Sequence, residues 1–177
     1  DSFLPSEFNI TPYLNNDENI LSVQVLRWSD GAYLEDQDQW NMSGIQRAVL
    51  LLAEPKVRIA DFFYQTKLFD NYKNAVFSLR PRVENNSGIT TKGYQIKAQL
   101  YNADKKPVFS RPFNRSTIDL LTEPYPRLDN VKFGFFEDTV YNPQLWSDET
   151  PYLYTLIVFF EDSLGNTVEA KRCKVGF

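Results

Sequence analysis

The fold class is decided by an alternating stretch, Tyr94-Gln95-Ile96-Lys97-Ala98-Gln99-Leu100-Tyr101. Apolar residues occupy every second position, and polar residues fill the positions between them. Side chains of a strand point alternately to opposite faces, so this pattern predicts a strand with one face on a core. Further strands are predicted over residues 57–63, 75–83, 108–112, 131–136, 152–161 and 167–175.

Turn signals separate these strands, and no convincing helix is predicted after Lys56. Such signals stand at Asp70-Asn71, in residues 85–88 and 102–104, and in residues 163–166. Seven strands over residues 55–177 predict an all-β fold, an immunoglobulin-like β-sandwich domain. The Cys…Trp…Cys spacing of antibody domains is absent, because Cys173 is the only cysteine.

Residues 1–54 predict a second, incomplete β region. Two strands are expected, over residues 20–26 and 45–52, with one short helical turn at Thr11-Pro12. Two strands cannot close a sheet, and isolated hairpins are marginal in water. The chain begins at Asp1 without Met and ends on Phe177, so both ends are expected to have been cut from a longer polypeptide.

The connection between those two strands, residues 27–47, is long and unusual. It carries Trp28, Tyr33 and Trp40 together with four acids, Asp30, Glu35, Asp36 and Asp38. Aromatic side chains are costly to leave in water, and long connections are commonly functional. We expect the two tryptophans to anchor this loop.

Composition excludes several classes of function. A net charge of −4 argues against nucleic acid or an anionic membrane as partner, and no apolar run is long enough to span a membrane. With no His and a single Cys, zinc or copper sites and His-dependent nucleophilic catalysis are not expected. Chemistry would have to come from carboxylates or from another piece of polypeptide.

The acids of the loop leave several interpretations open. Glu35, Asp36 and Asp38 would suit glycoside hydrolysis only as an opposed pair, which closeness in sequence does not supply. They would also pair with Arg27 or Arg47, cap loop amides, or bind sugar hydroxyls or a hard cation. Outside the loop, we expect burial of Trp146 under a sandwich corner and packing roles for Cys173 and for Tyr152, Tyr154, Phe159 and Phe160.

The run Leu34-Glu35-Asp36-Gln37-Asp38-Gln39-Trp40, followed by Ser43-Gly44-Ile45 and Arg47, resembles the end of the sugar-binding domain of glycoside hydrolase family 2 β-galactosidases. Residues 1–8 and 26–31 resemble that domain too. Residues 142–147, 151–154 and 175–177 are similar to the family's immunoglobulin-like domain. The resemblance covers essentially the whole chain, and related β-glucuronidases differ in the acidic run.

This resemblance implies a non-catalytic scaffold fragment of a retaining enzyme that hydrolyses terminal β-D-galactosides such as lactose. Residues 1–54 would be the end of a jelly-roll, galactose-binding-like domain, and residues 55–177 the immunoglobulin-like domain. The catalytic (β/α)8 barrel would follow Phe177, so no catalytic residue is expected here. Asp38 would contact the galactosyl group and a sodium ion, whereas the magnesium ligands would lie elsewhere in the parent, which is expected to be a homo-oligomer.

Two other functions remain open, a stand-alone carbohydrate-binding or adhesion module and a purely structural interaction domain. Unpaired strands in residues 1–54 are expected to pair with another copy of the chain or to pack on the sandwich. The compartment stays open, with the cytoplasm or periplasm of a bacterium expected.

Overall fold

The computed structural model describes residues 6–34, 43–122 and 136–177. The chain divides into two compact units, Asp1–Leu52 and Ala53–Phe177. All-β architecture holds for the second unit, which is a two-sheet antiparallel sandwich of the immunoglobulin-like kind. No helix in the described part of the chain is long and apolar enough to cross a membrane.

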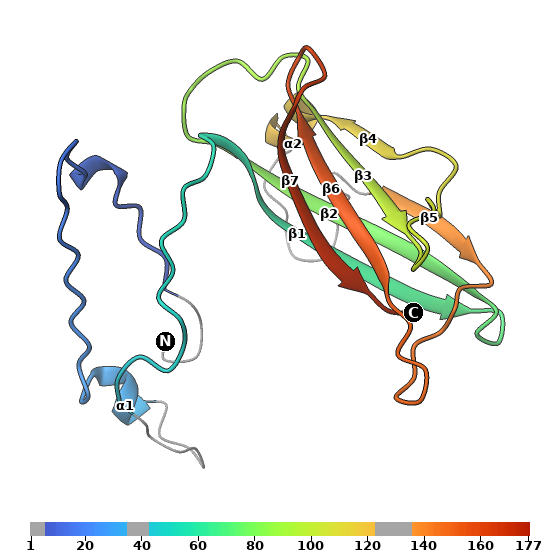
Figure 1. The fold of residues 1–177 in the computed structure, drawn as a ribbon, viewed down its shortest axis with the longest axis horizontal. Coiled ribbons are helices and arrows are strands. Elements are labelled where there is room, and N and C mark those ends of the chain that lie inside the picture. The colour runs from blue at the N-terminus through green and yellow to red at the C-terminus, as the bar shows by residue number, and fades with distance from the viewer. Residues whose placement is uncertain (1–5, 35–42, 123–135) are drawn as a thin grey trace. The chain divides into compact units, whose positions relative to one another are not determined.

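Unit 1 contains two short helical pieces and no strand among its described residues. The pieces are the 3-10 helix η1 (Thr11–Tyr13) and the helix α1 (Asp30–Leu34). The turn expected at Thr11-Pro12 is therefore present, and the Asn9 side chain accepts a hydrogen bond from the Thr11 N–H at 3.0 Å. Figure 1 draws the rest of the described segment as a plain trace.

The strands predicted over residues 20–26 and 45–52 are wrong for this structure. Both segments are without ladder bonds, and most of their large apolar side chains are exposed. A strand is maintained by backbone hydrogen bonds to a neighbour, and the two segments do not supply them to each other. Alternation of side chains therefore did not suffice to form a sheet here.

The described residues of unit 2 form seven strands in two sheets, and Figure 1 labels these strands. One sheet has the order β1-β2-β5, and the other the order β4-β3-β6-β7, with every pair antiparallel. The strand bounds are β1 Val57–Phe69, β2 Asn74–Asn85, β3 Gln95–Tyr101, β4 Phe113–Ser116, β5 Phe136–Tyr141, β6 Tyr154–Glu161 and β7 Thr167–Val175.

The core lies between the two sheets and is made from alternate residues of their strands. Phe77, Leu79, Ile96, Leu156 and Phe160 are completely buried there. Four phenylalanine rings contact one another through the centre, with centroids 4.8 to 6.4 Å apart among Phe77, Phe109, Phe113 and Phe136. Contiguous burial of this kind supplies the main stabilisation of a domain.

The region after β3 differs from the prediction in three places, the first being that a strand, β4, occurs at Phe113–Ser116 where none was predicted. Residues 108–112 do not form a strand; the Gln99 amide instead accepts hydrogen bonds from the Leu100 and Phe109 N–H groups and donates to the Phe109 carbonyl. The Gln99 side chain thus makes the hydrogen bonds to the Phe109 backbone that a neighbouring strand would otherwise make. The helix α2 (Thr117–Thr122) was missed, although Asp119 in its first turn is a helix-start signal. The strand predicted over 131–136 lies outside the described residues except for Phe136, which begins β5.

A seam of side-chain hydrogen bonds joins β1 to β7, the outer strands of different sheets. The Glu169 carboxylate accepts the Ile59 N–H at 2.7 Å, where β1 shifts register. The Tyr64 hydroxyl donates to the Lys174 carbonyl at 3.0 Å, and the Thr66 hydroxyl donates to the Gly176 carbonyl at 3.2 Å. A register shift leaves backbone groups unpaired, and Glu169 satisfies one of them.

Candidate functional site

The connection over residues 27–47 is described on either side of its acidic run. The helix α1 is entered through a turn in which the Ala32 N–H donates to the Ser29 carbonyl at 3.0 Å. The Arg27 guanidinium lies 5.0 Å from the centre of the Trp28 ring, a cation–π geometry. On the far side, Gly44 has φ +96°, a conformation that suits glycine.

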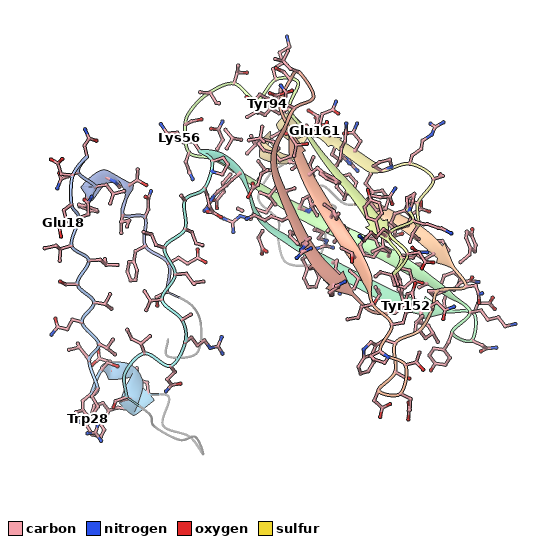
Figure 2. The ribbon with its side chains drawn as sticks, in the orientation of Figure 1. Glu18, Trp28, Lys56, Tyr94, Tyr152 and Glu161 are labelled. Atoms are coloured by element: carbon pink, nitrogen blue, oxygen red, sulfur yellow. The ribbon has the colours of Figure 1, made fainter. Side chains whose placement is uncertain are left out.

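The two described aromatic side chains of this connection, Trp28 and Tyr33, do not anchor it within unit 1. Trp28 is 64% exposed and Tyr33 is 74% exposed, and Trp28 lies beside α1 in Figure 2. The expectation that Trp28 fixes the loop by burial is therefore wrong, because its neighbour in the described structure is the exposed Arg27 side chain. Trp40 lies outside the described residues.

Asp38, the predicted substrate and sodium contact, also lies outside the described residues, together with Glu35 and Asp36. The structure consequently does not test whether these carboxylates come together. Among the described residues, no group of three His, Cys, Asp or Glu side chains is placed to hold a metal ion. Asp38 on its own would supply one oxygen ligand, the type preferred by hard cations.

In the described part of unit 2, the features that could support chemistry are a cysteine and a surface groove. The thiol of Cys173 is half-buried against the core, and burial raises its pKa, which disfavours the reactive thiolate. The packing role predicted for Cys173 fits this position. On the outer face of the β1-β2-β5 sheet, a groove of about 380 Å³ has one acid, Glu137, and two cations, Lys67 and Arg80, in its lining. It therefore lacks the paired carboxylates of a glycosidase site.

Two aromatic residues, Trp146 before β6 and Tyr154 at its start, form hydrogen bonds within unit 2. Tyr154, the first residue of β6, is buried, and its hydroxyl accepts the Gln144 N–H at 2.8 Å. This resembles the tyrosine corner of immunoglobulin-like sandwiches. Burial raises the pKa of Tyr154. Trp146 is 51% exposed, so its predicted burial is wrong; its backbone N–H donates to the Phe177 carbonyl.

A charged network at the start of unit 2 was not foreseen from the sequence. Glu54 pairs with Arg58 and lies 3.5 Å from Lys171, which in turn lies 3.3 Å from Glu169. Arg58 also pairs with Glu84 at 3.1 Å. Glu169 and Lys171 stand two residues apart in β7, which places them on one face and is the one sequence signal that pointed to this network.

Comparison with known proteins covers both units. The model of the glycosyl hydrolases family 2 sugar-binding domain matches residues 1–55, and a second family 2 model matches residues 57–177. Along 100% of its length the chain is similar to β-galactosidases from Priestia megaterium (37% identity), Vibrio cholerae (38%) and Erwinia tasmaniensis (39%). It spans only 16–17% of the length of these curated relatives.

Solved structures add support for the fold alone. A β-glucuronidase from Parabacteroides merdae superposes with a TM-score of 0.51 at 20% identity, over 70% of this chain and 14% of that one. The same enzyme with glycerol in its active site gives a TM-score of 0.52. The family models together match nearly every residue, and the second alone matches more than half of them. The chain belongs to glycoside hydrolase family 2.

Proposed function

We propose that this chain is a non-catalytic part of a retaining β-galactosidase that hydrolyses terminal β-D-galactosides such as lactose. The observation that carries the proposal is 37–39% identity to β-galactosidases from three bacteria along the entire chain. Retaining hydrolysis needs two carboxyl groups about 5–5.5 Å apart, one as nucleophile and one as acid/base. We assign both to polypeptide outside these 177 residues, consistent with the small share of the relatives that the chain spans.

Within that enzyme, the role proposed for unit 1 is to present the acidic run of residues 35–40 to the galactose site. Asp38 accepts hydrogen bonds from galactosyl hydroxyls and provides one ligand to a sodium ion; the remaining ligands, and those of magnesium, come from other parts of the enzyme. A hydrogen bond from a hydroxyl to a carboxylate contributes about 1.5–3 kcal/mol in a closed site. The sequence of the run, and its resemblance to the family, support this role.

The test is a pair of substitutions in the full-length enzyme, Asp38→Asn and, as a matched control, Asp36→Asn. Losing a charged contact of about 1.5–3 kcal/mol lowers kcat/KM about 10- to 150-fold. We expect that loss, with a weaker response to sodium, for Asp38→Asn only. Galactoside kinetics measured across a sodium titration would contradict the role of Asp38 if the two variants behaved alike.

The 177-residue chain by itself provides an independent test of the family-level proposal. It is expected to release no chromophore from a chromogenic galactoside, because both catalytic carboxyl groups are assigned elsewhere. Turnover by the pure chain would refute that assignment. Calorimetry with galactose addresses the alternative of a stand-alone carbohydrate-binding module, since millimolar or tighter binding by the isolated chain would favour it.

A further inference from the structure

The joint by which the chain enters unit 2 consists of residues 53–56, immediately before β1. Its backbone is restricted at two points. Pro55 has a fixed φ and disfavours a helical conformation at Glu54, the residue before it. The Lys56 carbonyl accepts the Asn86 N–H at 2.8 Å, which ties the joint to the residue after β2, and Figure 2 labels Lys56. The joint therefore reaches the sandwich with little backbone freedom.

The Glu54 side chain contacts strands of both sheets of unit 2. Its carboxylate pairs with Arg58 of β1 and lies 3.5 Å from the Lys171 Nζ of β7. β1 belongs to the three-stranded sheet and β7 to the four-stranded one. The Glu54 side chain is 26% exposed, so both contacts are partly shielded from water. A single side chain ahead of the first strand thus holds the joint to both layers of the sandwich.

Further carboxylates hold the two cations that Glu54 contacts. Arg58 pairs with Glu84 at 3.1 Å, and Lys171 pairs with Glu169 at 3.3 Å. Glu169 also accepts the N–H of Ile59 at 2.7 Å, so the network continues into the β1–β7 seam. An isolated ion pair at a protein surface contributes little, whereas several charges in a network contribute more. The partners of Glu54 are therefore fixed in place before the joint contacts them.

We propose that this charged network fixes the direction in which the chain enters unit 2, and that Glu54 is a positioning residue for the acidic run of residues 35–40. Along the chain, the joint lies between that run and the sandwich. Freedom at the joint would therefore spread the positions open to Asp38, and a misplacement of about 1 Å can cost roughly a hundredfold in rate. The positioning of Asp38 rests on the function proposed above, whereas the restraint of the joint does not.

The first experiment measures the joint by limited proteolysis of the 177-residue chain with trypsin. Cleavage after Lys56 requires the start of β1 to leave the sandwich, so the release of a fragment that begins at Val57 reports the open population. Glu54→Gln keeps the size of the side chain, removes its charge and is expected to raise the rate about three- to tenfold. The matched control is Glu161→Gln, because Glu161 pairs with Lys97 at 2.6 Å in the same sandwich, and its rate should not change.

A second variant, Lys171→Met, tests whether Glu54 acts through the network. It removes a cation beside Glu54 and should also raise the rate, and the double variant should be cleaved no faster than Glu54→Gln alone. Circular dichroism at the assay temperature checks that unit 2 remains folded in each variant. The restraint would be overturned by an unchanged rate for Glu54→Gln, by an equal increase for Glu161→Gln, or by effects of the two network substitutions that multiply.

The second experiment measures positioning in the full-length enzyme. Glu54→Gln is expected to lower kcat/KM for galactosides about three- to tenfold and to weaken the response to sodium, whereas Glu161→Gln changes neither. In an Asp38→Asn background, Glu54→Gln should have no further effect, because a positioning residue acts through the group that it positions.

Unchanged kinetics for Glu54→Gln, or a further loss in the Asp38→Asn background, would overturn the positioning role. Unchanged kinetics for Asp38→Asn itself would refute the function proposed for Asp38, and the positioning role with it. The proteolysis rates decide independently whether the network restrains the joint, so the two failures can be told apart.

Discussion

The two units of this chain contain similar alternating sequence, but among the described residues only those of unit 2 form sheets. Of the residues that the structure describes in unit 2, eighteen hydrophobic ones are buried in one core. In unit 1 no described residue is buried, and Leu21, Val23 and Val25 remain exposed. The difference teaches that alternation specifies which face of a strand is apolar, whereas pairing partners decide whether the strand exists.

The same difference predicts unequal costs for one chemical change. Leu156→Ala removes a completely buried side chain from β6 and is expected to lower the free energy of unfolding by about 2–5 kcal/mol. Leu51→Ala in unit 1 truncates a side chain that is 80% exposed, and its effect should stay within about 0.5 kcal/mol. Urea denaturation followed by far-ultraviolet circular dichroism measures both. Similar losses would mean that unit 1 has a core of its own.

The β1–β7 seam tests a second difference between the units, because in unit 2 a side chain satisfies a buried backbone N–H group. Glu169→Ala leaves the N–H of the fully buried Ile59 without its acceptor, at an expected cost of about 1–3 kcal/mol. The control is Glu137→Ala, because Glu137 is an exposed glutamate of β5 on the outer face of its sheet. Its cost should be below about 0.5 kcal/mol. Equal effects in thermal or urea denaturation would show that the seam contributes nothing to stability.

The smallest expected effect concerns Tyr154 and alkaline pH. Burial raises its pKa above the ordinary value of 10.0, so the unfolded chain ionises first as the pH rises. Its stabilising contribution is complete below pH 10.0 and is lost as the pH rises through the higher native pKa. Tyr154→Phe should cost about 1 kcal/mol at neutral pH, through loss of the Gln144 hydrogen bond, and should show a shallower alkaline decline. A decline as steep as that of the unchanged chain would contradict this assignment.

Strand bounds were predicted correctly from the sequence where an alternating segment also has a neighbouring strand to pair with. β3 and β7 occur at or within one residue of their predicted bounds, because each pairs with β6 over nearly its full length. It failed at residues 108–112, where the Gln99 side chain takes the position of a ladder partner, and at α2, whose six residues give little periodicity.

The candidate site was predictable only through its motif. The acids of residues 35–38 drew attention by composition, and the family resemblance singled out Asp38. The tertiary network around Glu54 and Glu169 had little sequence signal, because the contact that joins its two halves, Glu54 with Lys171, links residues 117 positions apart. Pairs of that separation are set by sheet packing, which local pattern does not encode.

The β1–β7 seam also sets an order of events during synthesis. Each of its three hydrogen bonds joins residues 110 positions apart. At about 5–20 residues per second, roughly 6–22 s separate the appearance of β1 from that of its partners in β7. During that interval β1 can pair with β2, but its register shift at Ile59 has no acceptor. We therefore expect the sandwich of unit 2 to close only after β7 has been synthesised, whereas the β1–β2 hairpin can form earlier.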